Sequence, residues 1–520
     1  MIKLPGRSRR SSIRALAGAV VALALVAAGC SGGGTAAGPQ ASGQGGVLNI
    51  GSPYAPNSLD PAKINLAMVW YADLAYDPLI YLAPSGKLQP RLALSWGYVG
   101  NSNEVFELHL RPNVRFSDGS PLTADVVKAN ILYMRGSTGG VAAYFSGVQS
   151  VDVPSPLTVR ITLSAPDPSL PEIFTQQYQA GNMASGPALQ QPQKLATQTL
   201  GAGPYVLDSA ASVANDHYTY TPNPHYWNKS AIHYQQVVVK VFPNANTALA
   251  ALKTGQVDVI QGMYSTADAA SAAGLRVLSV PHVFQGLALA DRAGSIVPAL
   301  GNLQVRQALN YAVDRQQLSS ALLSKYGKPT EQIALPGQDG YSSHTFYSYD
   351  PAKARQLLAQ AGYPHGFTLP VVDDTNIDVL TQAIADQLKA VGVTVQITDD
   401  SDPNQYLRDL TSGKFAAYAI GYGSQPIYIE GPQLFLPSAA VFNPHKSSDP
   451  QIESLYSQAA AANPAERAQL DQQIVTRLDQ QAWFVPVTFV PVFYFSRPTV
   501  GGINASTAAP SADPADWLPA

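Results

Sequence analysis

Apolar residues recur along this chain at two alternating spacings, one typical of strands and the other of helices. The run YQQVVVKVF, which begins at Tyr234, is rich in β-branched residues and predicts a strand. A short helix is expected next, with Asn246 as its N-cap and Gly255 at its end, followed by a second strand at 257–260. Together these residues predict a strand, a helix and a strand, the βαβ unit of an α/β fold.

The same order of elements recurs further along the chain. FTLPVV at 367–372 and VTVQI at 393–397 each predict a strand. A helix capped by Thr375 or Asn376 is expected between them, with Gly392 at its end. One face of that helix is apolar and consists of Leu380, Ile384, Leu388 and Val391.

Three further stretches have the spacing and the terminal residues of helices. Residues 305–315 predict a helix with one buried stripe, made of Val305, Ala308, Leu309, Ala312 and Val313. Asp350 is the N-cap of a second predicted helix, which Gly362 ends, and Asn463 is the N-cap of a third. These helices add to the α/β pattern.

In one segment, residues 106–120, apolar and polar residues alternate one by one. FELHLRPNVRFSDGS at 106–120 has a period of two and a turn at Asp118 and Gly119, which predicts a β-hairpin. The fold class expected is therefore mixed α/β with an antiparallel insertion. The length of 520 residues, at about 150 residues per domain, favours three to four domains.

Charge and cysteine usage exclude several classes of function. The chain has 32 Lys and Arg against 35 Asp and Glu. Five of the basic residues, and no acid, lie within residues 1–29; without that segment the count is 27 against 35, a net charge of −8. An acidic body argues against nucleic-acid binding, and the single cysteine excludes internal disulfides and Cys-rich metal sites.

The beginning of the chain predicts export and lipid anchoring. An apolar run at 15–28 follows the basic residues and is too short to span a bilayer, which is typical of a signal peptide at 1–29. Ala28 and Gly29 before Cys30 resemble a bacterial lipobox, so Cys30 is expected to carry the lipid. An ordinary secretory signal with an incidental cysteine is the alternative. The charge-free, small-residue segment 30–45 predicts a flexible tether.

Motifs for several kinds of catalysis are absent from the sequence. It contains no phosphate-binding loop, no complete G-x-G-x-x-G, no G-x-S-x-G and no H-E-x-x-H. His217, His225 and His233 recur every eight residues, a spacing that shares no helix face, so no metal site is predicted. Nothing in the sequence requires an enzyme or a cofactor.

Ten blocks of sequence carry a resemblance to a known family. They are NSLDPA (57–62), YDPLIY (76–81), LALSW (92–96), FELHLRPNVRFSDGSPLTADVV (106–127), GAGPYVL (201–207), NPHYW (223–227), ALKTGQVDVI (251–260), VRQALNYAVDR (305–315), YDPAKARQLLAQAGYP (349–364) and WFVPV (483–487). In this order they resemble the family 5 extracellular solute-binding proteins, the peptide and nickel receptors of ABC importers. Most blocks have structural roles, for example Thr123 as a helix cap and Gly201 and Gly203 as sites of backbone freedom.

The resemblance implies a two-lobed periplasmic-binding-protein-like fold of type II, cluster C, with an extra inserted α+β subdomain. Lobe I would consist of 46–75, 201–285 and 487–520, the inserted subdomain of 76–200, and lobe II of 286–486. Ligand would bind in the cleft between the lobes, which close over it.

The resemblance also implies where ligand is recognised. In peptide-binding relatives, a segment of lobe II carries a tryptophan and then an aspartate that pairs with the peptide's α-ammonium group. Here Tyr422 takes the aromatic place and Ser424 the acidic place. A hydroxyl cannot supply that charge-assisted bond, so the site should discriminate against free α-amino groups unless Glu430 or another acid of the cleft wall substitutes.

Further candidate contacts are aromatic or polar residues near the expected cleft edges. They are Tyr54, Trp70, Tyr71, Tyr178, Asn182, Phe284, Gln285 and Gln425. Aromatic residues with polar neighbours suit ligand clefts, although each of these residues could equally belong to the core.

The sequence thus predicts a monomeric, lipid-anchored substrate-binding protein on the outer face of the cytoplasmic membrane. It would capture a small-molecule or oligopeptide ligand and deliver it to an ABC permease and ATPase complex. The alternatives are a lipid-anchored secreted hydrolase, a receptor for an oligosaccharide or metal chelate, and a sensor with the same fold.

Overall fold

The computed structural model describes residues 45–374, 377–400, 402–439 and 441–520. Contacts divide the chain into residues 1–43 and residues 44–520, and the described residues belong to the second unit. The predicted signal peptide, Cys30 and the candidate caps Thr375 and Asn376 lie outside the described residues. Gly45, the last residue of the predicted tether, already belongs to the first strand.

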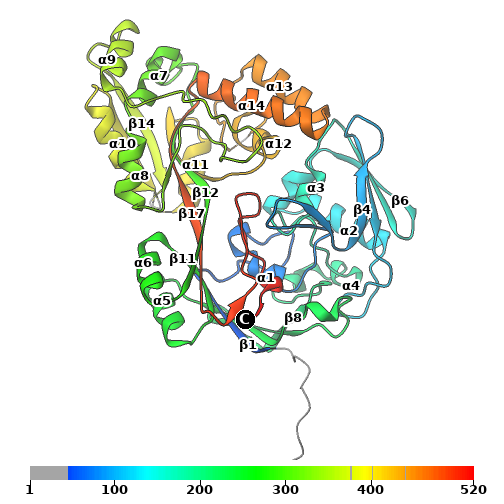
Figure 1. The fold of residues 1–520 in the computed structure, drawn as a ribbon. Helices are drawn as coiled ribbons and strands as arrows, with labels where there is room; N and C mark the ends of the chain where they lie inside the picture. Colours follow the sequence, from blue (N-terminus) through cyan, green and yellow to red (C-terminus); the bar gives the residue numbers. More distant parts are fainter. Residues whose placement is uncertain (1–44, 375–376, 401, 440) are drawn as a thin grey trace, which may run out of the picture. The chain divides into compact units, whose positions relative to one another are not determined.

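One large mixed sheet runs through the molecule (Figure 1). Within the described residues it has eleven strands. Ten of them lie in the order β15 (Thr394–Asp400), β14 (Thr368–Asp374), β16 (Ala417–Gly423), β12 (Arg276–Leu289), β17 (Phe484–Ser496), β11 (Val259–Gly262), β1 (Gly45–Ser52), β10 (Tyr234–Val241), β9 (His217–Pro222) and β8 (Tyr205–Val213), and β13 (Lys328–Pro329) pairs with β17.

The long antiparallel strands β12 and β17 connect the two halves of this sheet. β16 pairs with β12 between Val283 and Leu289, whereas β11 pairs with β17 between Phe493 and Ser496. β12 and β17 pair with each other from Arg276–Ser496 to Ala288–Phe484. The two halves are therefore joined through the middle of the sheet by these two strands.

The first half of the sheet contains the βαβ unit predicted at 234–260. β10 leads into α5 (Ala245–Thr254) and then β11, and β1 lies between the two strands and parallel to both. Gly255 ends the helix with φ of 77°, as expected. The cap is Asn244 rather than Asn246, because the Asn244 side chain accepts hydrogen bonds from the backbone N–H groups of Asn246 and Thr247.

The second half contains the other predicted unit. β14 and β15 are parallel and are joined by α10 (Asp378–Lys389). The predicted apolar face is buried, because Leu380, Ile384 and Leu388 are each at most 4% exposed. Gly392 has φ of 99°, which explains the glycine after the helix.

Helices flank the second half of the sheet. They are α7 (Leu303–Tyr311), α8 (Arg315–Leu323), α9 (Pro351–Gln360), α10, α11 (Pro403–Thr411), α12 (Ile427–Glu430), α13 (Pro450–Ala461) and α14 (Pro464–Gln480). Asp350 and Asn463 are N-caps, as predicted. The single helix predicted at 305–315 ends at Tyr311 instead, because Asp314 caps a new helix by accepting a hydrogen bond from the Gln317 N–H. Its predicted stripe is nevertheless fully buried.

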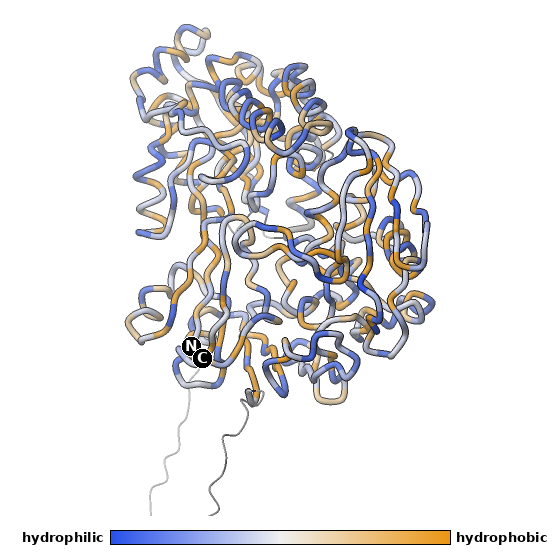
Figure 2. The backbone as a smooth tube through the Cα atoms, turned by 45° about the vertical axis from the view of Figure 1, so that its right-hand side comes forward, coloured by the Kyte–Doolittle hydropathy of each residue, from blue (hydrophilic) through white to orange (hydrophobic). Residues whose placement is uncertain are grey.

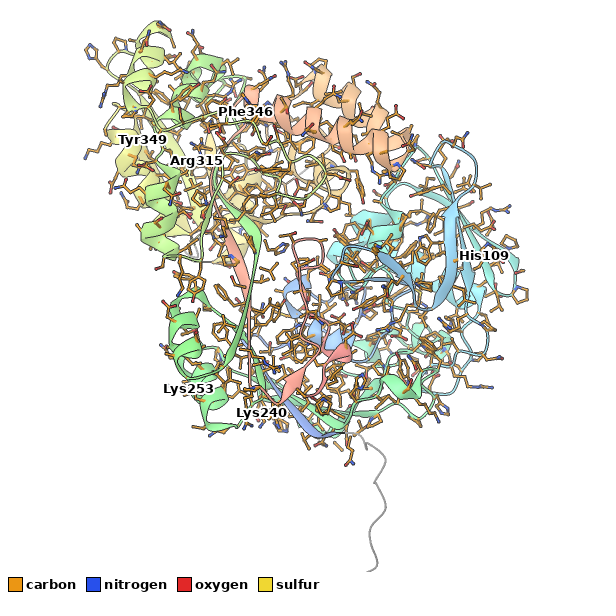
Figure 3. The ribbon with its side chains drawn as sticks, in the orientation of Figure 1. His109, Lys240, Lys253, Arg315, Phe346 and Tyr349 are labelled. Carbon is orange, nitrogen blue, oxygen red and sulfur yellow. The ribbon has the colours of Figure 1, made fainter. Side chains whose placement is uncertain are left out.

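A buried arginine ties α8 to β17. Arg315 donates to the backbone oxygens of Pro486 and Asn310, at 2.8 and 3.0 Å, and to the Asn310 side chain at 2.7 Å. Burial lowers the pKa of Arg315 to about 10. Figure 3 shows Arg315 among the helices of this half. This arginine of the family-like block at 305–315 is therefore a structural residue.

A separate antiparallel sheet forms the predicted insertion. It has the order β4 (Ala93–Tyr98), β5 (Val105–Leu110), β7 (Thr158–Leu163) and β6 (Val148–Ser155), and α2 (Ala124–Arg135) packs against it. Its outer face carries the exposed His109 (Figure 3). Nearby short elements are β2 (Ile80–Leu82), β3 (Leu88–Pro90), α3 (Leu170–Ile173) and α4 (Gly186–Leu189).

The hairpin predicted at 106–120 is wrong, because β5 does not pair with the segment that follows the turn. β5 pairs with β4 and β7, while Asp118 and Gly119 close only a short turn with a bridge between Arg115 and Pro121. The turn itself is correct, since Gly119 has φ of 82°. β5 instead lies between β4 and the distant β7, because packing across the whole insertion sets the pairing. Thr123 caps α2, as expected.

The hydropathy of the chain follows the arrangement of its helices and strands. In Figure 2 apolar and polar positions alternate along the strands and helices. Separate apolar cores lie in the insertion, in the first half of the sheet and in the second half.

Smaller elements complete the first half: α1 (Trp70–Asp73), α6 (Tyr264–Ala272), β18 (Val500–Gly501) and β19 (Leu518–Pro519). The domain boundaries expected from the sequence stay a prediction.

Candidate functional site

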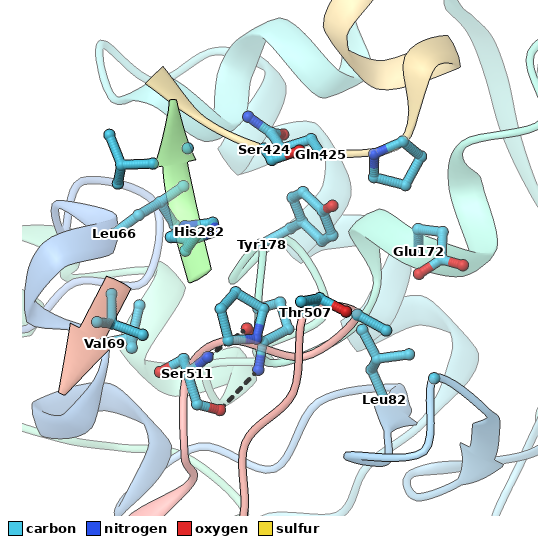
Figure 4. A pocket seen from close by; sticks show the side chains of 18 of the residues that line it. Leu66, Val69, Leu82, Glu172, Tyr178, His282, Ser424, Gln425, Thr507 and Ser511 are labelled. Atoms are coloured by element: carbon cyan, nitrogen blue, oxygen red, sulfur yellow. Dashed lines mark hydrogen bonds between the residues drawn. The ribbon is translucent and has the colours of Figure 1, made fainter. Parts of the chain in front are cut away.

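A cavity of about 710 Å³ lies against the two connecting strands. One wall comes from residues 66–71 and from the C-terminal segment 507–511. Residues 82–86 and 172–178, from the inserted region, form a second wall, and residues 337–339 and 423–428 with Arg467 form a third. Both halves of the large sheet and the insertion thus contribute to one cavity (Figure 4).

The back of the cavity is made by β12 and β17. His282 and Val283 of β12 line it together with Val492 and Tyr494 of β17. His282 lies at a shift in the register between these strands, and its backbone oxygen accepts a hydrogen bond from the Ser424 N–H at 2.9 Å. Burial lowers the pKa of His282 to about 4, so its imidazole is neutral at physiological pH.

The C-terminal segment is held against the insertion by one side chain. The Gln177 amide accepts a hydrogen bond from the Ser511 N–H and donates one to the Ser511 oxygen, at 3.1 and 3.0 Å. Figure 4 shows this paired contact below the cavity. The pairing fixes the wall formed by 507–511 to the wall that carries Glu172 and Tyr178.

Three charged side chains line the cavity, and the sequence reasoning missed all three. They are Glu172 of α3, Asp339 of the 337–339 loop and Arg467 of α14. The pKa of Glu172 is raised to about 7, mainly by burial; Arg467 and a hydrogen bond from Tyr428 oppose this rise, and the charge of Asp339 adds to it. No short motif marks these residues, because three distant segments supply them.

A second cavity of about 660 Å³ adjoins the first. Glu172, Tyr428 and Arg467 line both cavities and therefore lie between them. The Arg467 guanidinium lies 4.6 Å from the centre of the Tyr428 ring, and its Nε atom is buried without a hydrogen-bond partner. In the described part of the chain, no ion pair joins Arg467 to a carboxylate.

The sequence and the fold both match known proteins. The profile of the bacterial extracellular solute-binding proteins, family 5 (middle region), matches residues 87–438. The chain belongs to this family. The glutathione-binding protein GsiB of Salmonella typhimurium is 27% identical over 361 residues, which cover 68% of this chain and 69% of GsiB. Family 5 proteins bind small molecules or peptides outside the cytoplasm and work with ABC transporter permeases.

Solved structures confirm the predicted fold class. DppA from Helicobacter pylori, in complex with the peptide STSA, is 21% identical and superposes with a TM-score of 0.76, over 92% of this chain and 98% of DppA. NikZ from Campylobacter jejuni, in complex with Ni(L-His), is 20% identical with a TM-score of 0.76, over 91% and 99% of the two chains. These similarities show the two-lobed family 5 fold. The relatives are binding proteins and not enzymes.

Four of the residues predicted for this family 5 cleft lie on the cavity wall: Tyr71, Tyr178, Ser424 and Gln425. The Tyr71 hydroxyl donates to the Tyr54 oxygen at 2.8 Å, and the Ser424 hydroxyl donates to Gln338 Oε1 at 2.7 Å. Gln425 Oε1 is buried without a hydrogen-bond donor. Trp70 also lines the cavity, while its ring packs on Tyr494 and Trp517.

Three predicted residues lie in the core instead of the cavity wall. Phe284 is fully buried and packs against Phe484 and Tyr422. Tyr422 is buried between Phe284 and Phe442, and its hydroxyl donates to Gln433 Oε1 at 3.0 Å. Asn182 is buried and donates to Gln179 Oε1 at 2.7 Å. All three side chains contact neighbours within the protein, while Asn182 Oδ1 is buried without a hydrogen-bond partner.

Two further predicted residues, Tyr54 and Gln285, do not line the cavity. Tyr54 is 52% exposed, so its ring lies at the surface. Gln285 pairs with Gly421 and Thr488 inside the sheet and does not line the cavity. β12 reaches the cavity through His282 and Val283, which lie at the shift in register that follows Pro281.

Glu430 does not supply the missing acid at position 424. Its side chain is fully buried, and Oε1 accepts a hydrogen bond from the Gln425 N–H at 2.9 Å. Burial raises the pKa of Glu430 to about 8. It does not line either cavity. The acids of the cavity wall are therefore Glu172 and Asp339.

In the described ranges, no group of three or more His, Cys, Asp or Glu side chains could hold a metal ion. Among the helices of those ranges, none is both long and apolar enough to cross a bilayer.

Proposed function

We propose that this family 5 protein is the lipid-anchored receptor of an ABC importer and that its cargo is a peptide or a peptide-like solute. The observation that carries this proposal is the 710 Å³ cavity, to which both halves of the sheet and the insertion contribute. Its volume is in the range of small-molecule sites, which are about 300–1,000 Å³. The names of relatives support a peptide-like cargo, since GsiB binds glutathione and DppA is bound to a peptide.

Four predicted residues are proposed as direct ligand contacts. Tyr71 and Tyr178 offer aromatic surface, and Ser424 and Gln425 offer polar atoms on the wall formed by 423–428. Such a mixture buries apolar area and fixes the orientation of a small ligand with a few hydrogen bonds. Gln425 Oε1 is especially suited to accept a bond from the N–H groups of a peptide, because no donor in the protein reaches it.

The site of action follows from the predicted leader. Cys30 would carry lipid, and the segment 30–45 would connect it to the body of the protein. Processing at a lipobox attaches several acyl chains, and several chains hold a protein on a membrane far better than one. We propose that the protein acts as a monomer on the outer face of the cytoplasmic membrane, with lobe I, the inserted subdomain and lobe II as predicted.

Mass spectrometry of solute that co-purifies with the full-length protein tests the cargo. Denaturation should release peptides or peptide-like molecules. The Gln425→Ala variant should retain less of them than the wild type, while Gln396→Ala, at an exposed position of β15, should retain the same amount. Release of an oligosaccharide or a metal chelate instead would contradict the peptide cargo and leave the receptor role intact.

A further inference from the structure

We propose that Asn103 of the insertion is a latch, which holds the insertion against the second half of the molecule by capping the C-terminal end of α13. Asn103 Nδ2 donates to the backbone oxygen of Ala460 at 2.9 Å and to that of Ala462 at 3.3 Å. Asn103 lies in the loop between β4 and β5, and Ala462 is the C-cap of α13. The inference goes beyond the proposed function, because it holds for any cargo.

The sequence explains why the end of α13 needs a donor from elsewhere. The last carbonyl groups of a helix have no partner within that helix. The residue four positions after Ala460 is Pro464, which has no N–H group, so the following turn cannot supply the missing donor. Ala460 and Ala462 are both buried residues, and buried carbonyl groups are costly to leave unpaired. The side chain of Asn103 supplies the donor from the insertion.

The backbone holds Asn103 in an uncommon conformation. Its φ is 54°, in the left-handed region that asparagine tolerates better than most residues other than glycine. The Asn103 oxygen accepts a hydrogen bond from the Asp167 N–H at 3.1 Å, and the Glu104 oxygen accepts one from the Leu163 N–H at 2.8 Å. These bonds anchor the loop to the rest of the insertion. The amide of Asn103 is therefore positioned by the insertion before it meets α13.

The insertion is tied more firmly to the first half than to the second. Arg91 pairs with Asp516 at 3.6 Å, and the Gln177 side chain makes two hydrogen bonds with the backbone of Ser511. This C-terminal segment packs into the core of the first half. By contrast, no ion pair in the described ranges joins the insertion to the second half. When the halves separate, the insertion should stay with the first half, and the bonds of Asn103 should break.

The surface around the latch is suited to separation. It lies on the side of the molecule away from β12 and β17, where α13 and α14 meet the insertion (Figure 1). Tyr428 and Ile429 of α12 pack into the apolar core of the insertion. The second cavity, of about 660 Å³, lies beside them and is lined by Asn103 on one side and Ala462 on the other. An interface with such a void lacks the close packing of a protein interior, so directional hydrogen bonds are needed to define its position.

Hydrogen–deuterium exchange of the full-length protein in detergent, read by mass spectrometry, tests the latch. Asn103→Gly removes the donor, and glycine readily adopts the left-handed backbone. Exchange of the amides in 99–105 and 461–468 should rise about fivefold, as for the loss of one hydrogen bond. Asn103→Asp should have a larger effect, because its carboxylate would face two carbonyl oxygens at the negative end of a helix. Small-angle X-ray scattering should give both variants a larger radius of gyration than the wild type.

Asn101→Gly and Asn101→Asp are the matched controls. Asn101 is an exposed residue of the same loop and lines the second cavity, but among the described residues its side chain makes no hydrogen bond to α13. Both control variants should have the exchange rates and the radius of the wild type. The urea midpoint of the Asn103 variants should also stay unchanged, because the latch joins two parts that are each folded without it.

The outcomes decide between a latch and a residue with a local role. Unchanged exchange in both Asn103 variants would overturn the latch. Faster exchange with an unchanged radius would make Asn103 a helix cap alone and would also overturn it, as would a lower urea midpoint with faster exchange throughout α13. None of these results bears on the cargo, so the receptor role would be tested separately by the solute that co-purifies.

Discussion

At the scale of single residues, a buried carboxyl group organises the turn after β16. Glu430 lies beneath the cavity wall, where Oε1 accepts a hydrogen bond from the Gln425 N–H and Oε2 has no partner. Burial raises its pKa to about 8, from the usual value of 4.5. The protonated acid is therefore the form that the folded protein accommodates at neutral pH.

This burial predicts a loss of stability at alkaline pH. Because the pKa of Glu430 is higher in the folded state than in the unfolded state, the folded state binds more protons between pH 4.5 and about 8. The stabilising contribution is complete below the unfolded pKa and is lost as the pH rises through about 8. The free energy of urea unfolding of the wild type, relative to Glu430→Gln, should fall between pH 5 and pH 8.5.

Glu466→Gln serves as the control for this measurement, because Glu466 is exposed at the first turn of α14. Its pH profile should parallel that of the wild type. Parallel profiles for the wild type and Glu430→Gln would show that Glu430 is not desolvated as the structure implies.

At the scale of elements, two glycines allow the chain to return from the insertion. The sequence suggested that Gly201 and Gly203 provide backbone freedom, but neither has a positive φ. A Cβ atom at Gly203 would lie 2.4 Å from the carbonyl carbon of Ala75, and one at Gly201 would lie 2.2 Å from the Ala75 oxygen. Both glycines are required by close backbone packing against the segment after α1.

Gly203→Ala should therefore destabilise the protein. Overpacking of this kind costs about 1–3 kcal/mol, and here the contact is with backbone atoms that cannot rotate away. The urea midpoint should fall accordingly. Gly97→Ala in β4 is the control, since a Cβ atom there would meet nothing within 4 Å. Equal midpoints for wild type and Gly203→Ala would contradict the close packing.

At the scale of the whole molecule, β12 and β17 connect the halves of the sheet, and we expect the halves to move about these two strands. The shifts in register at Pro281/Val283 and Gln285/Gly286 interrupt regular pairing beside the cavity. Such irregularities allow strands to bend and twist locally. Binding should accordingly be accompanied by hinge closure over the cargo.

Closure predicts a measurable change in solution. Small-angle X-ray scattering should give a smaller radius of gyration when the protein is saturated with the solute that co-purifies with it. The same solute should leave the radius of Gln425→Ala unchanged at concentrations where that variant does not bind. An unchanged radius for the saturated wild type would exclude a hinge mechanism.

Membrane attachment is a separate property of the whole molecule. Cys30→Ala should leave the body folded and release the processed protein from membranes, because the lipid would have no thiol to attach to. Fractionation at high salt measures the pelleted share, and Ser31→Ala should stay with the membranes. A Cys30→Ala protein that still pelleted after removal of the signal segment would refute the lipid anchor.

The sequence by itself determined the class of fold and the ends of several of its helices. Hydrophobic periodicity and capping residues are local signals, so Asp350, Asn463 and Gly255 mark helix ends wherever the segment lies in space. Ordered blocks of family-like residues spread along most of the chain predicted the two-lobed architecture. The cap of α5 was predicted wrongly, because Asn246 also has the side chain of an N-cap, whereas Asn244 is the residue that caps the helix.

Only the tertiary structure decided which strand pairs with which and which side chains meet in the cavity. β5 pairs with the distant β7 because pairing is set by packing across the whole insertion. Phe284 and Tyr422 pack into the core, while Glu172, Asp339 and Arg467 meet at one cavity. Their roles depend on distances between segments remote in sequence, and those distances arise only when the halves of the sheet and the insertion pack together.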